Sequence, residues 1–369
     1  MKIAVGAPLS GMAAALGREM AQAIEMAVYD ANQAGGIDGR RIEVWTLDDG
    51  GDEEEGLRAA RSFIADHQVL AVVGHYNSNV TLRAAPLYHE AGLPLIAPIV
   101  SNPKLTHSGW QNVFRFTNSD DATAAAIAGY MIHQLGKRRA AVVTTATVYG
   151  TSMGDEFVRA FERLSGTVLE RYKVEEGAKD FADLVGHLPA DMDALFYGGT
   201  FEGAPLLRAM RSHGLSQLFA TGDGCWDISN FLEPTGAAAE QGEGVLVLSA
   251  CPEIGSVQGT REFAARYERR FGPVCNYAVN AYDSAMTLIA AIRDAATAGG
   301  SPPDRLRILN ELRTAKRQGI AYPEPISWDQ YGDNVASVTA LHTVSDGQFR
   351  QVALIPGERI GSEMENPML

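Results

Sequence analysis

Cysteine is scarce in this chain, with only Cys225, Cys251 and Cys275 among 369 residues. Three cysteines cannot all be paired, and their spacing has none of the close pairs typical of structural zinc sites. Cys251 and Cys275 could form one disulfide, whereas two buried thiols are the ordinary alternative. The sequence therefore excludes a fully paired disulfide framework.

The chain also has no run of eighteen apolar residues and no basic cluster. Because a membrane-spanning helix needs such a run, none is expected. Lys and Arg number 31 against 45 Asp and Glu, which gives a formal net charge of −14. Nucleic-acid binding requires basic side chains facing phosphates, so nucleic acid is excluded as a partner.

Signals for catalysis and metal binding are weak as well. The eight histidines are scattered without an H-x-H or H-E-x-x-H motif, so no metal site is expected. Residues 150–154 fit G-x-S-x-G, but a nucleophile elbow needs that serine directly after a strand, and residues 146–149 intervene. Residues 6–11 have the glycine spacing of a phosphate loop without the Lys-Ser/Thr that follows it. We therefore predict no enzymatic activity and no cofactor.

What the sequence does contain is enough length for two domains and the composition of a folded soluble protein, 46% hydrophobic and 21% charged. Short β-like runs alternate with amphipathic segments up to residue 221, as in repeated βαβ units. The predicted strands are 3–8, 41–47, 70–73 and 93–96 in a first series, and 139–145, 168–174, 194–197 and 217–221 in a second. Because the two series share order and spacing, we predict two similar α/β lobes.

The predicted helices follow the same alternation. They cover 17–34, 53–66, 120–135, 154–164, 181–188, 202–213, 260–271, 277–298 and 304–314, with a further helical stretch between the strands 70–73 and 93–96. A strand over 244–249 and a closing β-hairpin over 337–345 and 348–355 complete the assignment. No low-complexity linker separates the lobes, which indicates that the chain crosses between them more than once.

The segment 71–103 has a pattern typical of ligand capture. Two apolar strand-like runs each end in small polar residues: Tyr76, Asn77 and Ser78 after the first, and Ser101 after the second. In an open parallel sheet, ligands bind outside the carboxyl ends of the strands. Hydroxyls there, together with free amides at the start of a helix, suit a carboxylate.

The second series has complementary chemistry at its strand ends. Asp223 lies between two glycines after the strand 217–221, and Tyr149 follows the strand 139–145. A carboxylate at that position complements a ligand ammonium group. Each residue also has an ordinary structural interpretation: Ser78 and Ser101 as helix caps, Asp223 as a turn residue and Tyr149 as a packing residue.

Several motifs along nearly the whole chain resemble those of a known family. In order they are Val5–Gly11, Ala34–Gly39, Leu47–Asp49, Val72–His75, Ile96–Pro98, Tyr149-Gly150, Tyr197–Gly199 and Tyr282–Ala285. The chain resembles the substrate-binding proteins of branched-chain amino acid ABC transporters, related to the leucine/isoleucine/valine-binding protein. The resemblance implies the type I periplasmic binding fold, in which two Rossmann-like lobes with mostly parallel sheets are joined by three hinge crossovers and close over a ligand in the cleft between them. Lobe one is then expected to comprise 1–118 and 250–327, and lobe two 119–249 and 328–369.

The resemblance also implies a role for individual residues. In the family a loop serine, here Ser78, binds the ligand carboxylate, and a threonine that shares this work is replaced here by Ser101. The carbonyl of Ile99 would accept from the ligand ammonium. The acid that pairs with the ammonium is a glutamate in the leucine-type proteins and is shorter here, at Asp223, while Tyr149 matches a pocket tyrosine.

Departures from the family pattern concern the pocket for the ligand side chain. Thr200 stands where a tyrosine is expected, and Tyr76 and Asn77 alter the small apolar pocket of the leucine-type proteins. Trp226 and Tyr277 are candidates for additional aromatic surface. We therefore expect binding of an amino acid-like ligand, but not leucine, isoleucine or valine as the best one.

The predicted function is capture of a small amino acid or a related carboxylate or amide, and its delivery to the membrane permease of an ABC transporter. The expected location is the periplasm, with a secretory signal removed ahead of Met1. The alternative is a cytoplasmic amide or amino acid sensor of the same fold that regulates a partner protein. Both functions are binding without chemistry.

Overall fold

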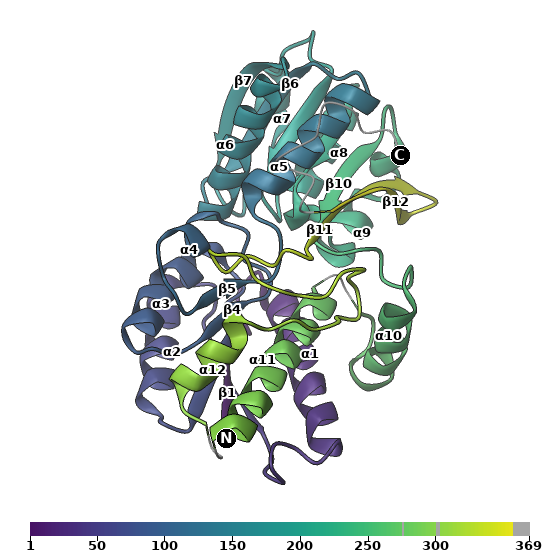
Figure 1. Ribbon diagram of the computed structural model, residues 1–369. Helices are drawn as coiled ribbons and strands as arrows, with labels where there is room; N and C mark the ends of the chain where they lie inside the picture. Colours follow the sequence, from purple (N-terminus) through teal and green to yellow (C-terminus); the bar gives the residue numbers. More distant parts are fainter. Residues whose placement is uncertain (275–276, 300–302, 357–369) are drawn as a thin grey trace. The chain divides into compact units, whose positions relative to one another are not determined.

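The computed structural model describes residues 1–274, 277–299 and 303–356 (Figure 1). The chain divides into two compact units. The first unit comprises Met1–Asn118 and Ile254–Ser337, and the second comprises Ser119–Glu253 and the chain from Val338 onward. The polypeptide thus passes from one unit to the other three times. Among the described helices, none is long and apolar enough to cross a membrane.

A five-stranded parallel sheet forms the centre of the first unit, in the order β2-β1-β3-β4-β5. Its strands are β1 (Lys2–Ala7), β2 (Glu43–Asp48), β3 (Val69–Gly74), β4 (Leu95–Ala97) and β5 (Val113–Arg115). Parallel strands covered by helices on both faces read as continuous apolar runs. The sequence VLAVVG of β3, buried at every position, is such a run.

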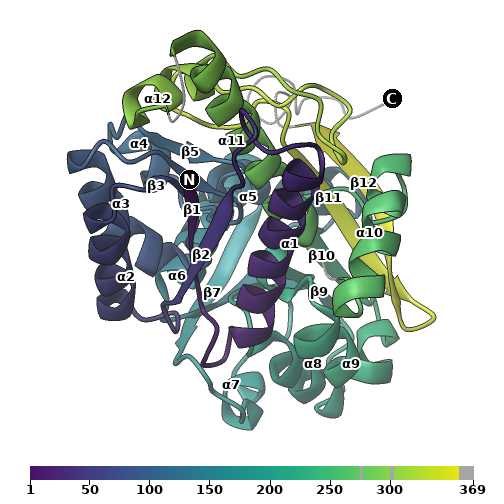
Figure 2. The same ribbon diagram turned by 90° about the horizontal axis from the view of Figure 1, so that it is seen from below.

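Helices cover both faces of this sheet. They are α1 (Ala14–Gln33), α2 (Glu53–Ala65), α3 (Ser78–Glu90), α4 (Lys104–His107), α10 (Gln258–Phe271), α11 (Ala278–Gly299) and α12 (Arg305–Arg313). Helix α1 packs against α11, and α2 packs against α3 (Figure 2). Right-handed crossovers place these two pairs on opposite faces, because the chain reverses its direction along the sheet after β2.

The second unit repeats this plan and adds a hairpin. Its sheet has the order β12-β11-β10-β9-β8-β6-β7. Strand β11 is antiparallel to both of its neighbours, β10 and β12. The strands are β6 (Arg139–Thr145), β7 (Thr167–Val174), β8 (Ala194–Gly198), β9 (Leu218–Thr221), β10 (Val245–Ser249), β11 (Val338–Ser345) and β12 (Gln348–Pro356). The helices are α5 (Asp120–Gly129), α6 (Val148–Arg163), α7 (Ala182–Gly186), α8 (Gly203–Ser212) and α9 (Glu233–Thr235).

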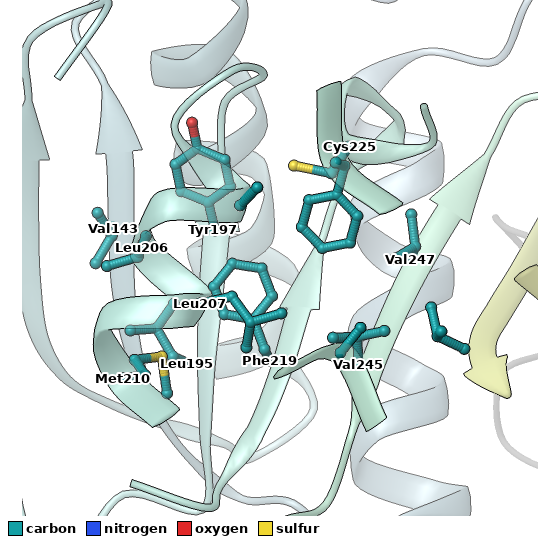
Figure 3. Packing of buried hydrophobic residues seen from close by; sticks show 14 of the residues in the cluster. Val143, Leu195, Tyr197, Leu206, Leu207, Met210, Phe219, Cys225, Val245 and Val247 are labelled. Atoms are coloured by element: carbon teal, nitrogen blue, oxygen red, sulfur yellow. The ribbon is translucent and has the colours of Figure 1, made fainter. Parts of the chain in front are cut away.

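Strand β6 shows how the second unit builds its core. Successive side chains of a strand point to opposite faces of the sheet. Ala140 and Val142 accordingly join the core under α5 and α6, whereas Ala141 and Val143 join the core under α8. Figure 3 shows the second of these cores, where Leu206, Leu207 and Met210 of α8 pack over Leu195, Phe219, Val245 and Val247 of the sheet.

The predicted fold class is confirmed, with two α/β units whose central sheets are mostly parallel. Some elements differ from the prediction. Helix α6 begins at Val148, six residues before the predicted start, because the Thr147 hydroxyl caps it by accepting from the Gly150 N–H at 3.0 Å. The helix predicted over 120–135 ends as an α-helix at Gly129 and continues as a π-turn over Tyr130–Gln134.

Three sets of short elements were not predicted: the four-residue helix α4, strand β5, and a series of turns after β9. The three residues of β5 include the charged Arg115, so no continuous apolar run identified this strand, whereas the equally short β4 lies in such a run. Asp223 begins a series of short helical turns: Asp223–Cys225, Ile228–Leu232, α9 and Gly236–Glu240.

The third passage between the units also differs from its predicted position. Residues 328–337, assigned from the sequence to the second lobe, belong to the first unit. The reason is their pairing beside β5, where the Arg115 N–H donates to the Gly332 carbonyl at 2.9 Å and the Asn334 N–H donates to the Arg115 carbonyl at 3.1 Å. Cys275 lies outside the described residues, so its pairing with Cys251 stays a prediction.

Candidate functional site

The two sheets share one strand order around corresponding strands, β2-β1-β3-β4-β5 in the first unit and β7-β6-β8-β9-β10 in the second. In each, the chain starts in an inner strand and reverses direction beside it. Ligands of open α/β sheets bind at the carboxyl ends of the strands at such a switch point. The candidate residues follow the strands at these ends: Tyr76, Asn77 and Ser78 after β3, Ile99 and Ser101 after β4, Tyr149 after β6, Thr200 after β8, and Asp223 and Trp226 after β9.

Ser78 is the first residue of α3 and is buried. The N-cap position belongs to Asn77, and no side chain caps this helix end. The interpretation of Ser78 as a helix cap is therefore wrong. Since the first amides of a helix have no acceptor within it, the Ser78 hydroxyl and these amides together form a set of donors suited to an anion.

Ser101 lies four residues after β4 and is buried as well. The following helix, α4, has Pro103 as its N-cap, and the Lys104 N–H donates to the Asn102 side-chain oxygen at 3.0 Å. Asn102, and not Ser101, therefore stabilises the start of α4. The Ser101 hydroxyl is therefore left for another partner. Ile99, which lies between β4 and Ser101 in the sequence, is also buried.

Arg115, which was not among the residues predicted from the sequence, holds the loop that carries Ser101. Its guanidinium is 1% exposed and donates to the carbonyls of Ser101 and Asn102 at 3.2 and 3.0 Å. The same group forms an ion pair with Asp333 at 2.7 Å. An arginine inside the apolar run Val113–Phe116 is the signal that could have found it, because a buried charge must be paired.

Tyr76 and Tyr277 form an aromatic pair in the first unit, and Asn77 follows Tyr76 in the sequence. The rings of Tyr76 and Tyr277 meet edge to face, with centroids 6.0 Å apart. The side-chain oxygen of Asn77 is buried and has no hydrogen-bond partner among the described residues. The two rings offer aromatic surface and Asn77 offers an acceptor, neither of which an aliphatic pocket would provide.

Tyr149 and Asp223 are joined in the second unit by a short hydrogen bond. The Tyr149 hydroxyl donates to Asp223 Oδ1 at 2.7 Å and accepts from the Gly224 N–H at 3.1 Å. Burial raises the pKa of Tyr149 well above its usual value, and the charges of Asp223 and Asp120 raise it further. The phenol is thus held as a donor to the carboxylate. Tyr149 lies in the first turn of α6 and not in a loop as predicted, because α6 begins at Val148.

Glycines on both sides of Asp223 allow the close packing of this turn. A Cβ on Gly222 would lie 2.6 Å from the Tyr149 hydroxyl oxygen. A Cβ on Gly224 would lie 2.5 Å from the Gly199 carbonyl oxygen and 3.2 Å from Cγ2 of Thr200. Larger residues at either position would push Tyr149 or the loop after β8 away, so the two glycines fix where the carboxylate lies.

Trp226 is nearly buried in a core cluster of the second unit. Its ring stacks on the imidazole of His342, with centroids 5.3 Å apart. Burial lowers the pKa of His342 to about 4, so this imidazole is neutral at pH 7. A part for Trp226 in ligand binding stays a prediction.

The G-x-S-x-G segment does not form a nucleophile elbow. Residues 150–154 lie within α6, so Ser152 is on a helix and not on a strand-to-helix turn. In the part of the chain that the structure describes, no group of three His, Cys, Asp or Glu side chains could hold a metal ion.

Comparison with known proteins supports a binding function. A protein named Leu/Ile/Val-binding protein homolog 2, from Brucella abortus (strain 2308), is 34% identical over 243 residues, which are 65% of this chain and 64% of the relative. The match thus spans just under two thirds of that relative. An amino acid binding protein from Pseudomonas aeruginosa is 27% identical over 354 residues, 95% of this chain and 92% of the relative.

A solved structure extends the comparison to the fold. The leucine binding protein LivK of Thermotoga maritima has a TM-score of 0.85 and 26% identity, with 97% of this chain and 99% of that chain covered. Both the Brucella relative and the Thermotoga protein are named as binding proteins, in agreement with the binding function predicted from the sequence. A model of the family described as periplasmic binding protein matches residues 1–348. The predicted relationship is confirmed, and this chain belongs to the periplasmic binding protein family.

Proposed function

We propose that this protein is the substrate-binding component of an ABC transporter. It captures a small amino acid-like ligand with residues of both units, which act as the two lobes, and delivers it to a membrane permease. Family membership supports this assignment, as do the names of the Leu/Ile/Val-binding and leucine binding relatives. The periplasm, after removal of a secretory signal, is the proposed location. Ligand binding shifts the protein from an open to a closed form, because the ligand makes more favourable contacts in the closed form.

The ligand carboxylate is assigned to the first unit. One observation carries this assignment: Ser78 and Ser101 lie at the ends of adjacent strands, and neither caps the helix that follows. Their hydroxyls and the first amides of α3 are donors, and a carboxylate is an acceptor only. The positive end of the α3 dipole favours the same charge.

The ligand ammonium is assigned to Asp223 in the second unit and to the carbonyl of Ile99 in the first. An ammonium group has three donors and no acceptor, so it needs carboxylate and carbonyl oxygens around it. The bond from Tyr149 fixes the orientation of the Asp223 carboxylate before the ligand arrives. Such preorganisation reduces the entropy lost on binding.

The ligand side chain is assigned to Tyr76, Asn77, Tyr277 and Thr200, with Trp226 as a further candidate. The edge-to-face tyrosine pair and the unpaired Asn77 oxygen favour a flat or hydrogen-bonding side chain over a branched aliphatic one. The preferred ligand is therefore a polar, aromatic or larger amino acid.

A thermal-shift screen of the twenty amino acids, aromatic acids and short amides tests this function. A ligand present at 100 times its Kd should stabilise the protein by about 2.7 kcal/mol, so true ligands will be evident. We expect at least one free amino acid to raise the melting temperature, and leucine, isoleucine and valine to raise it less. A screen in which no amino acid stabilises the protein would contradict the proposal.

A further inference from the structure

Three buried polar side chains of the first unit form a hydrogen-bonded chain. His75 Nδ1 lies 2.6 Å from Asp49 Oδ2, and His75 Nε2 lies 2.9 Å from the Tyr88 hydroxyl. All three side chains are fully buried. They come from three different places: Asp49 follows β2, His75 follows β3, and Tyr88 is in α3. None of them is among the ligand-binding candidates.

Hydrogen-bond satisfaction assigns the tautomer of His75. Among the described residues, the Tyr88 hydroxyl has His75 as its only hydrogen-bond partner. A buried hydroxyl hydrogen needs an acceptor, so Tyr88 donates to Nε2 and the ring proton is on Nδ1, facing Asp49. The other Asp49 oxygen accepts from the Gly51 N–H at 3.0 Å. Burial, and then the charge of Asp49, raise the pKa of Tyr88 well above its usual value, which keeps this donor protonated.

Gly6 makes the space that the imidazole occupies, and Gly74 allows the neighbouring strand to pack closely against Gly6. A Cβ on Gly6 would lie 2.3 Å from Cε1 of His75. Gly74, with φ of +149°, has a conformation that other residues rarely adopt, and a Cβ there would lie 2.5 Å from the Gly6 carbonyl oxygen. Three of the sequence motifs, Val5–Gly11, Leu47–Asp49 and Val72–His75, therefore contribute to one buried arrangement.

This arrangement brackets the proposed carboxylate-binding segment. His75 directly precedes residues 76–78, and Tyr88 is on the helix that Ser78 begins. Asp49 also extends these hydrogen bonds to the turn at Gly51, where a Cβ would lie 3.3 Å from the Asn77 side-chain oxygen. His75, the residue that leads into the segment 76–78, is thus tied to the end of β2 and to the body of α3 by hydrogen bonds that no ligand supplies.

We propose that His75 is a positioning residue, which holds residues 76–78 and the start of α3 in the geometry that presents Ser78 to the ligand carboxylate. The ligand part of this inference rests on the proposed function. The positioning part has readouts that need no ligand.

Nitrogen-15 NMR of the histidine-labelled full chain tests the tautomer, with the His75 signals assigned from their loss in His75→Gln. The wild-type protein should show His75 protonated at Nδ1. In Asp49→Asn the carboxamide can donate to Nδ1, so the proton should move to Nε2. A wild-type ring protonated at Nε2 would overturn the assignment of roles to Asp49, His75 and Tyr88.

Hydrogen exchange without ligand tests the positioning. Tyr88→Phe removes only the hydrogen bond between the Tyr88 hydroxyl and His75 Nε2. The amides of residues 81–85 in α3 should then exchange about fivefold to tenfold faster than in the wild-type protein. The matched control is Tyr322→Phe, since Tyr322 is also buried in the first unit and donates to Asn280 Oδ1 at 2.6 Å. Equal exchange of residues 81–85 in the two variants would overturn the proposal.

An equimolar mixture of the twenty amino acids serves as the probe for ligand binding. Tyr88→Phe should lose part of the melting-temperature shift that the mixture gives the wild-type protein, while Tyr322→Phe keeps it. A full shift in Tyr88→Phe would overturn the role of His75 in ligand binding. No shift in the wild-type protein would instead contradict the proposed function, and the exchange result would still decide whether His75 positions the segment.

Discussion

The two units have the same strand order but hold different chemistry at their strand ends. In the first unit, the candidates are hydroxyls and helix amides, which carry no full charge. In the second, they are a carboxylate and the phenol that donates to it. The sheet therefore fixes where functional residues can lie, and the loops decide which end of a ligand each unit can bind.

The units also differ in how they hold these residues in place. In the first, buried side chains from distant parts of the chain do so: Arg115 holds the loop of Ser101, and His75 is tied to Asp49 and Tyr88. In the second, the backbone does more of the work, because glycines beside Asp223 allow direct packing against Tyr149. Variants of the buried polar side chains in the first unit should thus act through lost hydrogen bonds. Larger residues at Gly222 or Gly224 in the second unit should act through steric clashes with Tyr149 or with the loop after β8.

The largest expected effect is that of Asp223→Ala on ligand affinity. Removing the carboxylate leaves the ligand ammonium without its counter-charge, and truncation of one partner of a buried charge pair costs roughly 2–5 kcal/mol. Titration calorimetry with the amino acid found in the thermal screen measures it. Unchanged affinity would remove Asp223 from the site and leave the two units without complementary charges.

Next in size are two opposite effects of pH, one in each unit. Burial raises the pKa of Asp283, in the first unit, from 3.8 to about 6, against the opposing hydrogen bond from Ile320 and the charge of Arg317. A carboxyl group whose pKa is higher in the folded state contributes stability that is fully present below its pKa in the unfolded state, 3.8. This stability is lost as the pH rises through the folded-state pKa of about 6. The size is about 3 kcal/mol. Urea unfolding between pH 4 and 8 should show this contribution in the wild-type protein and not in Asp283→Asn.

His342 of the second unit should act in the other direction. Burial lowers its pKa from 6.5 to about 4, so the folded state resists its protonation. Its contribution is present above pH 6.5 and is lost as pH falls toward 4, again by about 3 kcal/mol. In His342→Phe, which keeps a ring against Trp226, the free energy of unfolding should fall less with acid than in the wild-type protein. An identical pH dependence in the two proteins would contradict this assignment.

The smallest expected effects are those of Ser78→Ala and Ser101→Ala on affinity. Each removes one donor from the carboxylate, and leaving a buried polar group unsatisfied costs about 1–3 kcal/mol. Ser108→Ala is a matched control, since Ser108 is exposed and donates to the Lys104 carbonyl at 2.6 Å. If Ser78→Ala binds as tightly as the control, the carboxylate is not bound by the start of α3.

The sequence was sufficient for the fold wherever a pattern is local and repeated. Strand β6 was predicted with its observed limits, because seven residues after a helix end and before a turn give a clear signal. Strand β5, whose three residues include Arg115, gives none. The early start of α6 was missed because Tyr149-Gly150 reads as a loop unless Thr147 is recognised as its cap.

The positions of the candidate residues at the strand ends follow from the same local patterns. The residues that hold them do not. Asp49 and His75 are 26 residues apart, and Arg115 and Asp333 are 218 apart, so only the tertiary fold brings them together. Motifs such as Val72–His75 marked these positions without indicating what they contact.

Titration calorimetry with three forms of one ligand tests the central claim most directly. The forms are the amino acid that stabilises the protein most, its amide without a carboxylate, and its deaminated acid without an ammonium. If Ser78 and Ser101 of the first unit bind the carboxylate, and Asp223 of the second unit binds the ammonium together with the Ile99 carbonyl, each analogue should bind at least about tenfold more weakly, since each leaves buried groups unpaired. Equal affinity for either analogue would contradict the division of the ligand between the two units.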